Sequence, residues 1–148
     1  MEQSGKKYEF TVETIEVSGR TLHRIKAIRN FGYVKAGALG GFIEKEENLS
    51  HEGNCWVYND AKVYGDAEVC GNAEISMCSD FIVFKNWWSS GRYFTWTRSN
   101  NMWKVGCFYG TGEELIQKAY KDSEISGREY ERVVRYVESI LADEKKRE

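Results

Sequence analysis

Seven residues in the second half of the chain are of the types that bind nucleotides. The aromatic members could stack on a nucleobase, a contact worth about 1 to 3 kcal/mol per base. The basic members could hold phosphate groups through charge-assisted hydrogen bonds. The segment 81–112, which contains all seven, has no acidic residue. The sequence therefore predicts a ligand-binding surface made of Trp87, Trp88, Arg92, Trp96, Arg98, Trp103 and Lys104.

The same aromatic residues could instead form a hydrophobic core. The segment 81–112 contains ten aromatic residues, and the apolar residues from Tyr130 to Leu141 recur at helical spacing. Such a helix needs an apolar surface to cover, and the aromatic hairpin would supply it. A core cannot enclose Arg92 and Arg98. One face should therefore stay cationic and partly aromatic, suited to a nucleotide-like ligand or an acidic protein surface.

The elements that must position these residues start from a repeat. The stretch 53–76 consists of four hexads in register. Each hexad carries a β-branched aliphatic residue and, two positions earlier, a small residue: Val57, Val63, Val69 and Ile75, preceded by Cys55, Ala61, Ala67 and Ala73. A chain that coils around a triangular prism spends about six residues on each side, with coils roughly 4.8 Å apart. The hexads therefore predict a short β-helix, with up-and-down strands joined by Asx-Gly turns as the alternative.

The flanking segments complete the predicted fold. Residues 8–28 alternate around Ser18-Gly19-Arg20 and predict a β-hairpin, and residues 92–108 predict a second hairpin around Ser99-Asn100-Asn101. Two helices should begin at the capping boxes Thr111–Glu114 and Ser126–Glu129. The fold class is mainly β with an α+β C-terminal part. Three domains are expected: an N-terminal capping hairpin (1–30), a short hexapeptide-repeat β-helix (31–80) and an aromatic-rich lid (81–148).

Composition excludes several classes of protein. The formal net charge is −2, which gives no overall attraction to nucleic acid or an anionic membrane. We expect a soluble protein, because the chain has no apolar run of membrane-spanning length and no apolar signal-peptide core. The spacing of Cys55, Cys70, Cys78 and Cys107 fits no zinc motif. We therefore expect reduced cysteines, Cys55 and Cys107 as small buried residues, and no cofactor or metal.

Several stretches resemble one group of proteins over nearly the whole chain. Leu39–Ile43, Asn48–Val57, the Val-Tyr-Gly-Asp-Ala hexads and Val105–Thr111 are similar to phage and prophage proteins described as left-handed β-helix or hexapeptide-transferase-like proteins. The resemblance implies an origin in a mobile element and, by association, interaction with host machinery. We therefore expect a non-catalytic viral binding protein in the host bacterial cytoplasm. It would counter host defence by sequestering a nucleotide-type signal or by occupying a host protein.

Three alternatives remain open at this point. Hexapeptide acyltransferases use a histidine base, and His51 would be that base in an enzyme. A structural virion or assembly component is another possibility. The carboxylates Asp60, Asp66, Glu68 and Glu74 could form a calcium ladder, although a solvated face is favoured. A stack of so few coils buries little core, so we also expect a homo-oligomer, either a dimer or a trimer.

Overall fold

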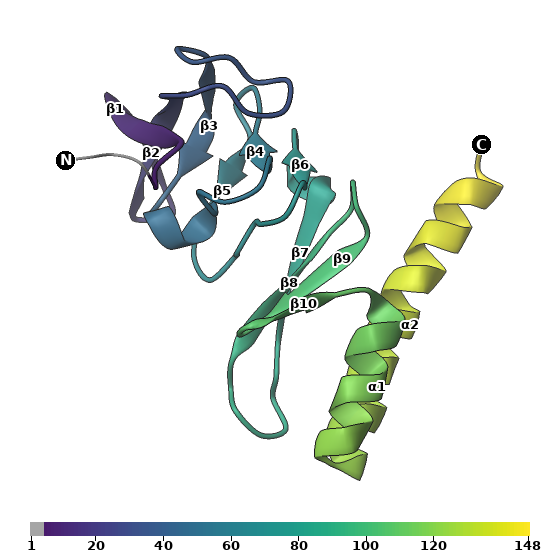
Figure 1. Ribbon diagram of the computed structural model, residues 1–148. Coiled ribbons are helices and arrows are strands. Elements are labelled where there is room, and N and C mark those ends of the chain that lie inside the picture. The colour runs from purple at the N-terminus through teal and green to yellow at the C-terminus, as the bar shows by residue number, and fades with distance from the viewer. Residues whose placement is uncertain (1–4) are drawn as a thin grey trace.

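The computed structural model describes residues 5–148 (Figure 1). Strands β1 (Tyr8–Val17) and β2 (Arg20–Ala27) form an antiparallel hairpin, and β3 (Leu39–Ile43) pairs antiparallel with β2. Strand β5 (Lys62–Val63) joins β3 in parallel, so the first sheet has the order β1-β2-β3-β5. Strands β4 (Trp56–Val57) and β6 (Glu74–Ile75) make a separate two-stranded parallel sheet.

The predicted hexapeptide-repeat β-helix is wrong. Within residues 5–148 the strands form three separate sheets, of which one is mixed and one antiparallel, and none is a solenoid. The hexads contribute strands of only two residues, divided between two sheets. The predicted N-terminal hairpin is present as β1 and β2, and β2 pairs directly with β3; its role as a cap stays a prediction. An antiparallel neighbour thus uses the edge of β3 on which a solenoid would add another parallel coil.

The six-residue period nevertheless identifies which side chains are buried. The aliphatic and small residues of all four hexads lie in one hydrophobic cluster together with Ile43, Leu49 and Trp56. Parallel partners in this region are 18 to 20 residues apart, as in Trp56 with Glu74 and Leu49 with Val69. Bringing these distant segments together places the hexad side chains in a common interior.

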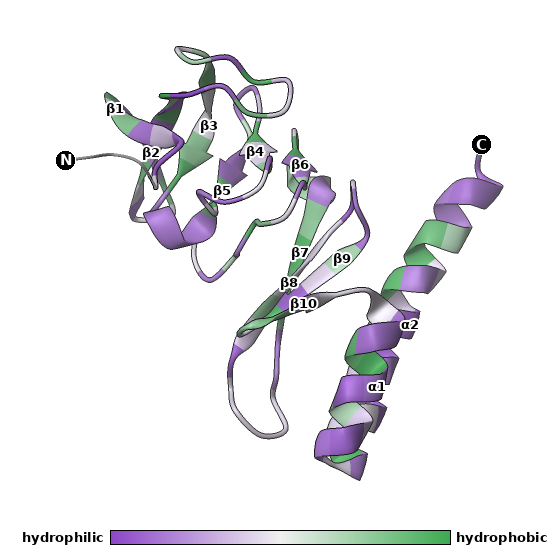
Figure 2. Cartoon of the chain, viewed as in Figure 1, coloured by the Kyte–Doolittle hydropathy of each residue, from purple (hydrophilic) through white to green (hydrophobic). Residues whose placement is uncertain are grey.

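The C-terminal half is an antiparallel sheet covered by two helices. Strands β7 (Phe81–Lys85), β8 (Tyr93–Thr97), β9 (Met102–Val105) and β10 (Phe108–Gly110) have the order β10-β9-β8-β7. Helices α1 (Gly112–Asp122) and α2 (Glu124–Lys146) pack on the sheet, and hydrophobic and hydrophilic positions alternate along both (Figure 2). In the described part of the chain, neither helix combines the length and apolar content needed to cross a lipid bilayer.

The sequence located one helix start and misplaced the other. Thr111 and Glu114 form the expected capping box of α1, each side chain bonding the other residue's backbone N–H. Helix α2 starts before the predicted Ser126, because Ser123 is its N-cap and accepts a hydrogen bond from the Ser126 backbone. Ser123 alone separates the two helices. This residue ends α1 and caps α2, so no loop precedes Ser126.

Side chains of the C-terminal sheet fasten it to the hexad segment. Thr95 Oγ1 accepts a hydrogen bond from the Glu68 backbone N–H at 3.0 Å. Ser99 Oγ accepts one from the Glu74 N–H at 2.8 Å. The two donors are six residues apart and hold equivalent positions in successive hexads. Strand β8 and the turn after it therefore bond to the repeat at its own spacing. Short 3₁₀ turns at Glu46–Asn48 (η1) and Cys78–Asp80 (η2) flank this junction. The expected domain limits at residues 30 and 80 stay predictions.

Candidate functional site

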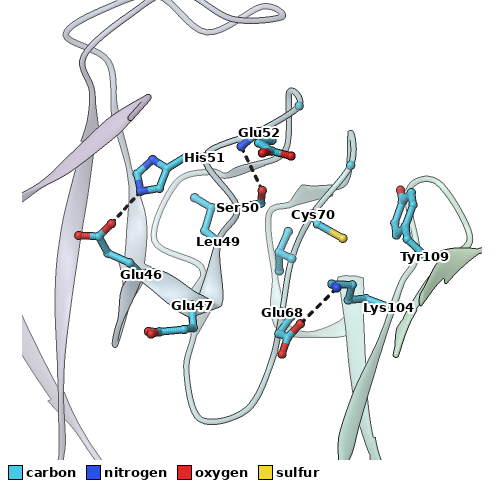
Figure 3. Close-up of a pocket in the computed structure, with 13 residues that line it drawn as sticks. Glu46, Glu47, Leu49, Ser50, His51, Glu52, Glu68, Cys70, Lys104 and Tyr109 are labelled. Carbon is cyan, nitrogen blue, oxygen red and sulfur yellow. Dashed lines mark hydrogen bonds and ion pairs between the residues drawn. The ribbon is translucent and has the colours of Figure 1, made fainter. Parts of the chain in front are cut away.

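A pocket of about 520 Å³ lies where the hexad segment meets the C-terminal sheet (Figure 3). Glu46 and Glu47 of η1 and residues 49–53 after it form one wall, and residues 68–71 form the floor. Lys104 from β9 and Tyr109 from β10 supply the opposite wall. The junction between the two halves of the chain therefore creates the pocket, and neither half encloses it alone.

Carboxylates dominate the pocket. The lining contains four carboxylates, those of Glu46, Glu47, Glu52 and Glu68, and one ammonium group, that of Lys104. The His51 ring and, secondarily, Lys6 hydrogen-bond the Glu46 carboxylate and lower its pKa. Glu68 lies 3.9 Å from Lys104 Nζ. Glu47 and Glu52 are exposed, and within residues 5–148 their carboxylates have no cationic partner.

The geometry of His51 leaves it without a free basic nitrogen. The Lys7 backbone N–H donates to His51 Nδ1 at 3.1 Å, which places the ring proton on Nε2. Nε2 then donates to Glu46 Oε1 at 2.8 Å, and the ring stacks on Tyr8 with centroids 4.1 Å apart. His51 therefore fastens β1 to the pocket wall. The other histidine, His23, stacks on Phe10 in the first sheet and does not line the pocket.

Lys7 supports the pocket wall at Gly53, a role that the sequence did not predict. Its side chain is fully buried, and Nζ donates to the carbonyl oxygens of Gly53 at 3.2 Å and Cys55 at 2.6 Å. The ammonium group also lies over the Phe31 ring, 4.6 Å from its centroid. Burial lowers the pKa of Lys7. A lysine near the N-terminus normally indicates a solvated residue, so no sequence signal could have identified this contact.

Two glycines allow the pocket walls to approach each other. Gly53 and Gly71 both have positive φ angles, of 73° and 67°. A Cβ on Gly53 would collide with the Gly71 carbonyl, and a Cβ on Gly71 would collide with the Tyr109 hydroxyl. Both positions therefore require glycine, for conformation as well as for space. The contact of Gly71 with Tyr109 depends on the C-terminal sheet.

The cysteines are all free, and they differ in exposure. Cys55 is buried beside Lys7, and Cys70 is half-buried in the pocket. Burial raises the pKa of Cys70 to about 11 and also raises the pKa of Cys55. Cys107 is exposed, so its expected burial is wrong: it lies in the turn between β9 and β10, outside both hydrophobic clusters.

Iodoacetamide should therefore modify the cysteines in a defined order. At about pH 8 we expect Cys78 and Cys107 to react first, Cys70 at least about tenfold more slowly, and Cys55 only after unfolding, because alkylation requires an accessible thiolate. The rate at Cys70 should keep rising up to about pH 11. Peptide mass spectrometry over a time course measures all four sites. In denaturant the four rates should converge, and equal rates at Cys70 and Cys78 in the folded protein would contradict the prediction.

Three of the predicted ligand-binding tryptophans serve the protein interior. Trp96 and Trp103 are 0% and 1% exposed and belong to the second hydrophobic cluster. Trp88 packs against that cluster, and its Nε1 donates to Ser126 Oγ at 3.1 Å. Trp87, by contrast, is 68% exposed in the loop between β7 and β8. The positions of Trp88, Trp96 and Trp103 therefore fit the alternative in which the aromatic residues form a hydrophobic core.

The predicted basic residues lie in different places. Arg98 donates to Glu144 and to the Ser79 carbonyl, and its guanidinium lies over the Trp96 ring. Lys104 lines the pocket, where its Nζ donates to the Gly106 carbonyl. Arg92 is exposed and lines a neighbouring hollow. The structure therefore does not gather the seven predicted residues on one surface.

No metal site accompanies the pocket. Within residues 5–148, no group of three or more His, Cys, Asp or Glu side chains is placed to hold a metal ion. Of the four carboxylates considered as a calcium ladder, Asp60 pairs with Arg24 at 2.9 Å and Glu68 lies near Lys104. Ion pairs therefore engage two of these four carboxylates.

Comparison with known proteins finds one partial similarity. No family model matches the chain. The chain is 50% identical over 38 residues to a protein of Escherichia coli (strain K12) named uncharacterized acetyltransferase YdcK. The match covers 26% of this chain and 12% of that protein, so the chain spans about an eighth of the relative. This is similarity to part of an acetyltransferase, and the resemblance to phage and prophage proteins stays a prediction.

Proposed function

We propose that this chain is a non-catalytic binding protein whose junction pocket holds a small ligand with a positively charged amine. The observation that carries the proposal is the charge of the pocket lining, which contains four carboxylates and one ammonium group. Glu47 and Glu52 are free to bind an ammonium group, since neither is paired within residues 5–148. Leu49 and Tyr109 add apolar and aromatic surface for the rest of the ligand.

The chemistry of the pocket favours binding over catalysis. Both ring nitrogens of His51 already have partners, so the residue has no lone pair with which to accept a proton from a substrate. The raised pKa of Cys70 keeps its thiol protonated at neutral pH and therefore weakly nucleophilic. Lys104 is held by Gly106 and lies near Glu68. These lining residues provide contacts and charge without an activated nucleophile.

The biological part of the proposal rests on the resemblance seen in the sequence. A phage- or prophage-encoded protein that binds a host signal or a host protein would need no catalytic residues. Among small ligands, the carboxylate excess favours an amine over a nucleotide, because phosphate groups would be repelled by Glu47 and Glu52. A nucleotide-type signal, a host protein partner and the dimer or trimer all stay predictions.

Hexylamine is a suitable probe for the amine site. We expect its addition to shift the backbone amide NMR signals of residues 46–53 and 68–71, with an affinity that falls as salt rises. The double variant Glu47→Gln, Glu52→Gln should bind about five- to tenfold more weakly, because it removes the two unpaired carboxylates. The matched control is Asp143→Asn, Glu148→Gln, which removes two charges from the end of the chain and should bind as the wild type does. Shifts confined to another surface, or an unchanged affinity of the pocket variant, would refute the proposal.

A second candidate function is acetyl transfer, favoured by the similarity to the E. coli acetyltransferase. An amine acceptor would fit the same pocket. Incubation of the protein with acetyl-coenzyme A and hexylamine, followed by mass spectrometry of the amine, tests this function directly. Turnover abolished by His51→Ala and retained by His23→Ala would support the enzyme and overturn the non-catalytic proposal. Binding of hexylamine without any turnover supports the binding protein.

A further inference from the structure

A second hollow adjoins the junction pocket. This hollow has a volume of about 430 Å³ and lies between the turn at residues 65–68 and the start of β8. Glu47 and Glu68 line both cavities, so the two lie side by side along the junction, and together they are called the groove. A ligand that enters the pocket can therefore extend past these two carboxylates toward the second hollow.

The charge of the groove changes sign along its length. The pocket end has Glu46 and Glu52 against Lys104, and the shared middle has the two glutamates alone. The far end has Lys45 and Arg92 against the single carboxylate of Asp66. The electrostatic energy of an ammonium ion is lowest at the pocket end or in the middle of the groove. An anionic group finds its best position at the far end.

Arg92 is the far-end residue best suited to hold an anion. Its side chain is exposed, and within residues 5–148 no hydrogen bond or ion pair occupies its guanidinium group. The guanidinium packs against Gly106, where an added Cβ would collide with it. Tyr93, which is 42% exposed, stands beside it. A planar guanidinium without hydrogen-bond or ion-pair partners can bind a carboxylate with two parallel hydrogen bonds.

We infer that the ligand of this groove is a zwitterion, with an amine at the pocket end and a carboxylate at Arg92. The inference rests on the proposed amine site and adds the second recognition group. Glu47 and Glu52 bind the ammonium group, a short apolar chain passes Glu68, and Arg92 binds the acid. Amino acids with a terminal side-chain amine, and peptides that contain them, belong to this class.

Three probes of equal chain length separate the two ends of the site. ε-Aminocaproate carries both charges, hexylamine only the amine, and hexanoate only the acid. Calorimetric or NMR titration of the full chain should give ε-aminocaproate an affinity about tenfold above that of hexylamine, with no binding of hexanoate, since a charge-assisted hydrogen-bonded pair contributes roughly that factor. Arg92→Gln should remove the tenfold advantage and leave the affinity for hexylamine unchanged.

Matched variants make the outcomes distinct. Arg147→Gln, which changes an exposed arginine near the end of α2, should keep the preference for ε-aminocaproate. The double variant Glu47→Gln, Glu52→Gln should weaken both amines. Equal affinity of the wild type for ε-aminocaproate and hexylamine, or an unchanged preference in Arg92→Gln, overturns the zwitterion while the amine site stands. Failure of every amine to bind overturns the proposed function itself.

Discussion

Replacing Trp96 with alanine should lower the free energy of unfolding by about 3 to 5 kcal/mol. The Trp96 side chain is 0% exposed and belongs to the second hydrophobic cluster, so its removal leaves a cavity in that core. The change also removes the Nε1 donor that bonds Asn101 Oδ1 at 2.7 Å in the turn between β8 and β9. Urea denaturation followed by far-ultraviolet circular dichroism measures the loss.

Trp87→Ala is the matched control for this prediction. Trp87 is 68% exposed, so the same chemical change should alter the free energy of unfolding by no more than about 0.5 kcal/mol. The pair also separates the core from the stacking surface expected from the sequence. A nearly neutral Trp96→Ala that nevertheless loses ligand binding would contradict the buried position and support the stacking role.

Asn48→Asp should destabilise the protein as much as Trp96→Ala does, although it scarcely changes the volume of the side chain. Asn48 is 0% exposed, and its Nδ2 donates to the carbonyl oxygens of Gly65 at 3.1 Å and Ala67 at 2.9 Å. A carboxylate would lose both donors and face the two carbonyls as a buried negative charge. We expect the free energy of unfolding to fall by about 3 to 5 kcal/mol, measured by urea denaturation at neutral pH.

Asn30→Asp controls for the chemistry of the substitution. Asn30 is exposed, and its Oδ1 accepts a hydrogen bond from the Ala36 backbone N–H at 2.8 Å. Aspartate can accept the same bond, so this variant should stay within about 0.5 kcal/mol of the wild type. Similar stabilities of the two Asn→Asp variants would show that the amide donors of Asn48 do not hold the hexad turn to the pocket wall.

Asn48 also illustrates how local sequence can mislead. It stands in the charged run Glu44–Asn48, whose composition predicts an excursion from a corner of the repeat. The side chain turns inward, since Oδ1 accepts hydrogen bonds from the backbones of Glu44 and Lys45 while Nδ2 reaches the next turn of chain. Lys45, Glu46 and Glu47, which precede it, are exposed. Composition predicts the average environment of a segment, and hydrogen-bond partners about 20 residues away decide the exception.

The candidate site was predicted only in part for the same reason. Lys104 was named as a binding residue and lines the pocket, and Arg92 lines the hollow beside it. Glu47 and Glu52, which carry the proposed charge recognition, were not identified, because exposed glutamates are common on any surface. The alternation of aromatic residues correctly predicted the hairpin formed by β8 and β9. It could not tell which aromatic face the helices would cover.

The hexad period by itself determined which residues enter the first core, since Val57, Val63, Val69 and Ile75 are all buried there. A repeat of six residues specifies the direction of each side chain, which is a local property of the backbone. Only the tertiary structure decided the partners of each short strand, the docking of the sheet through Thr95 and Ser99, and the groove between them. Strand pairing depends on contacts between segments far apart in the chain, and hydrophobic periodicity does not specify which segments make those contacts.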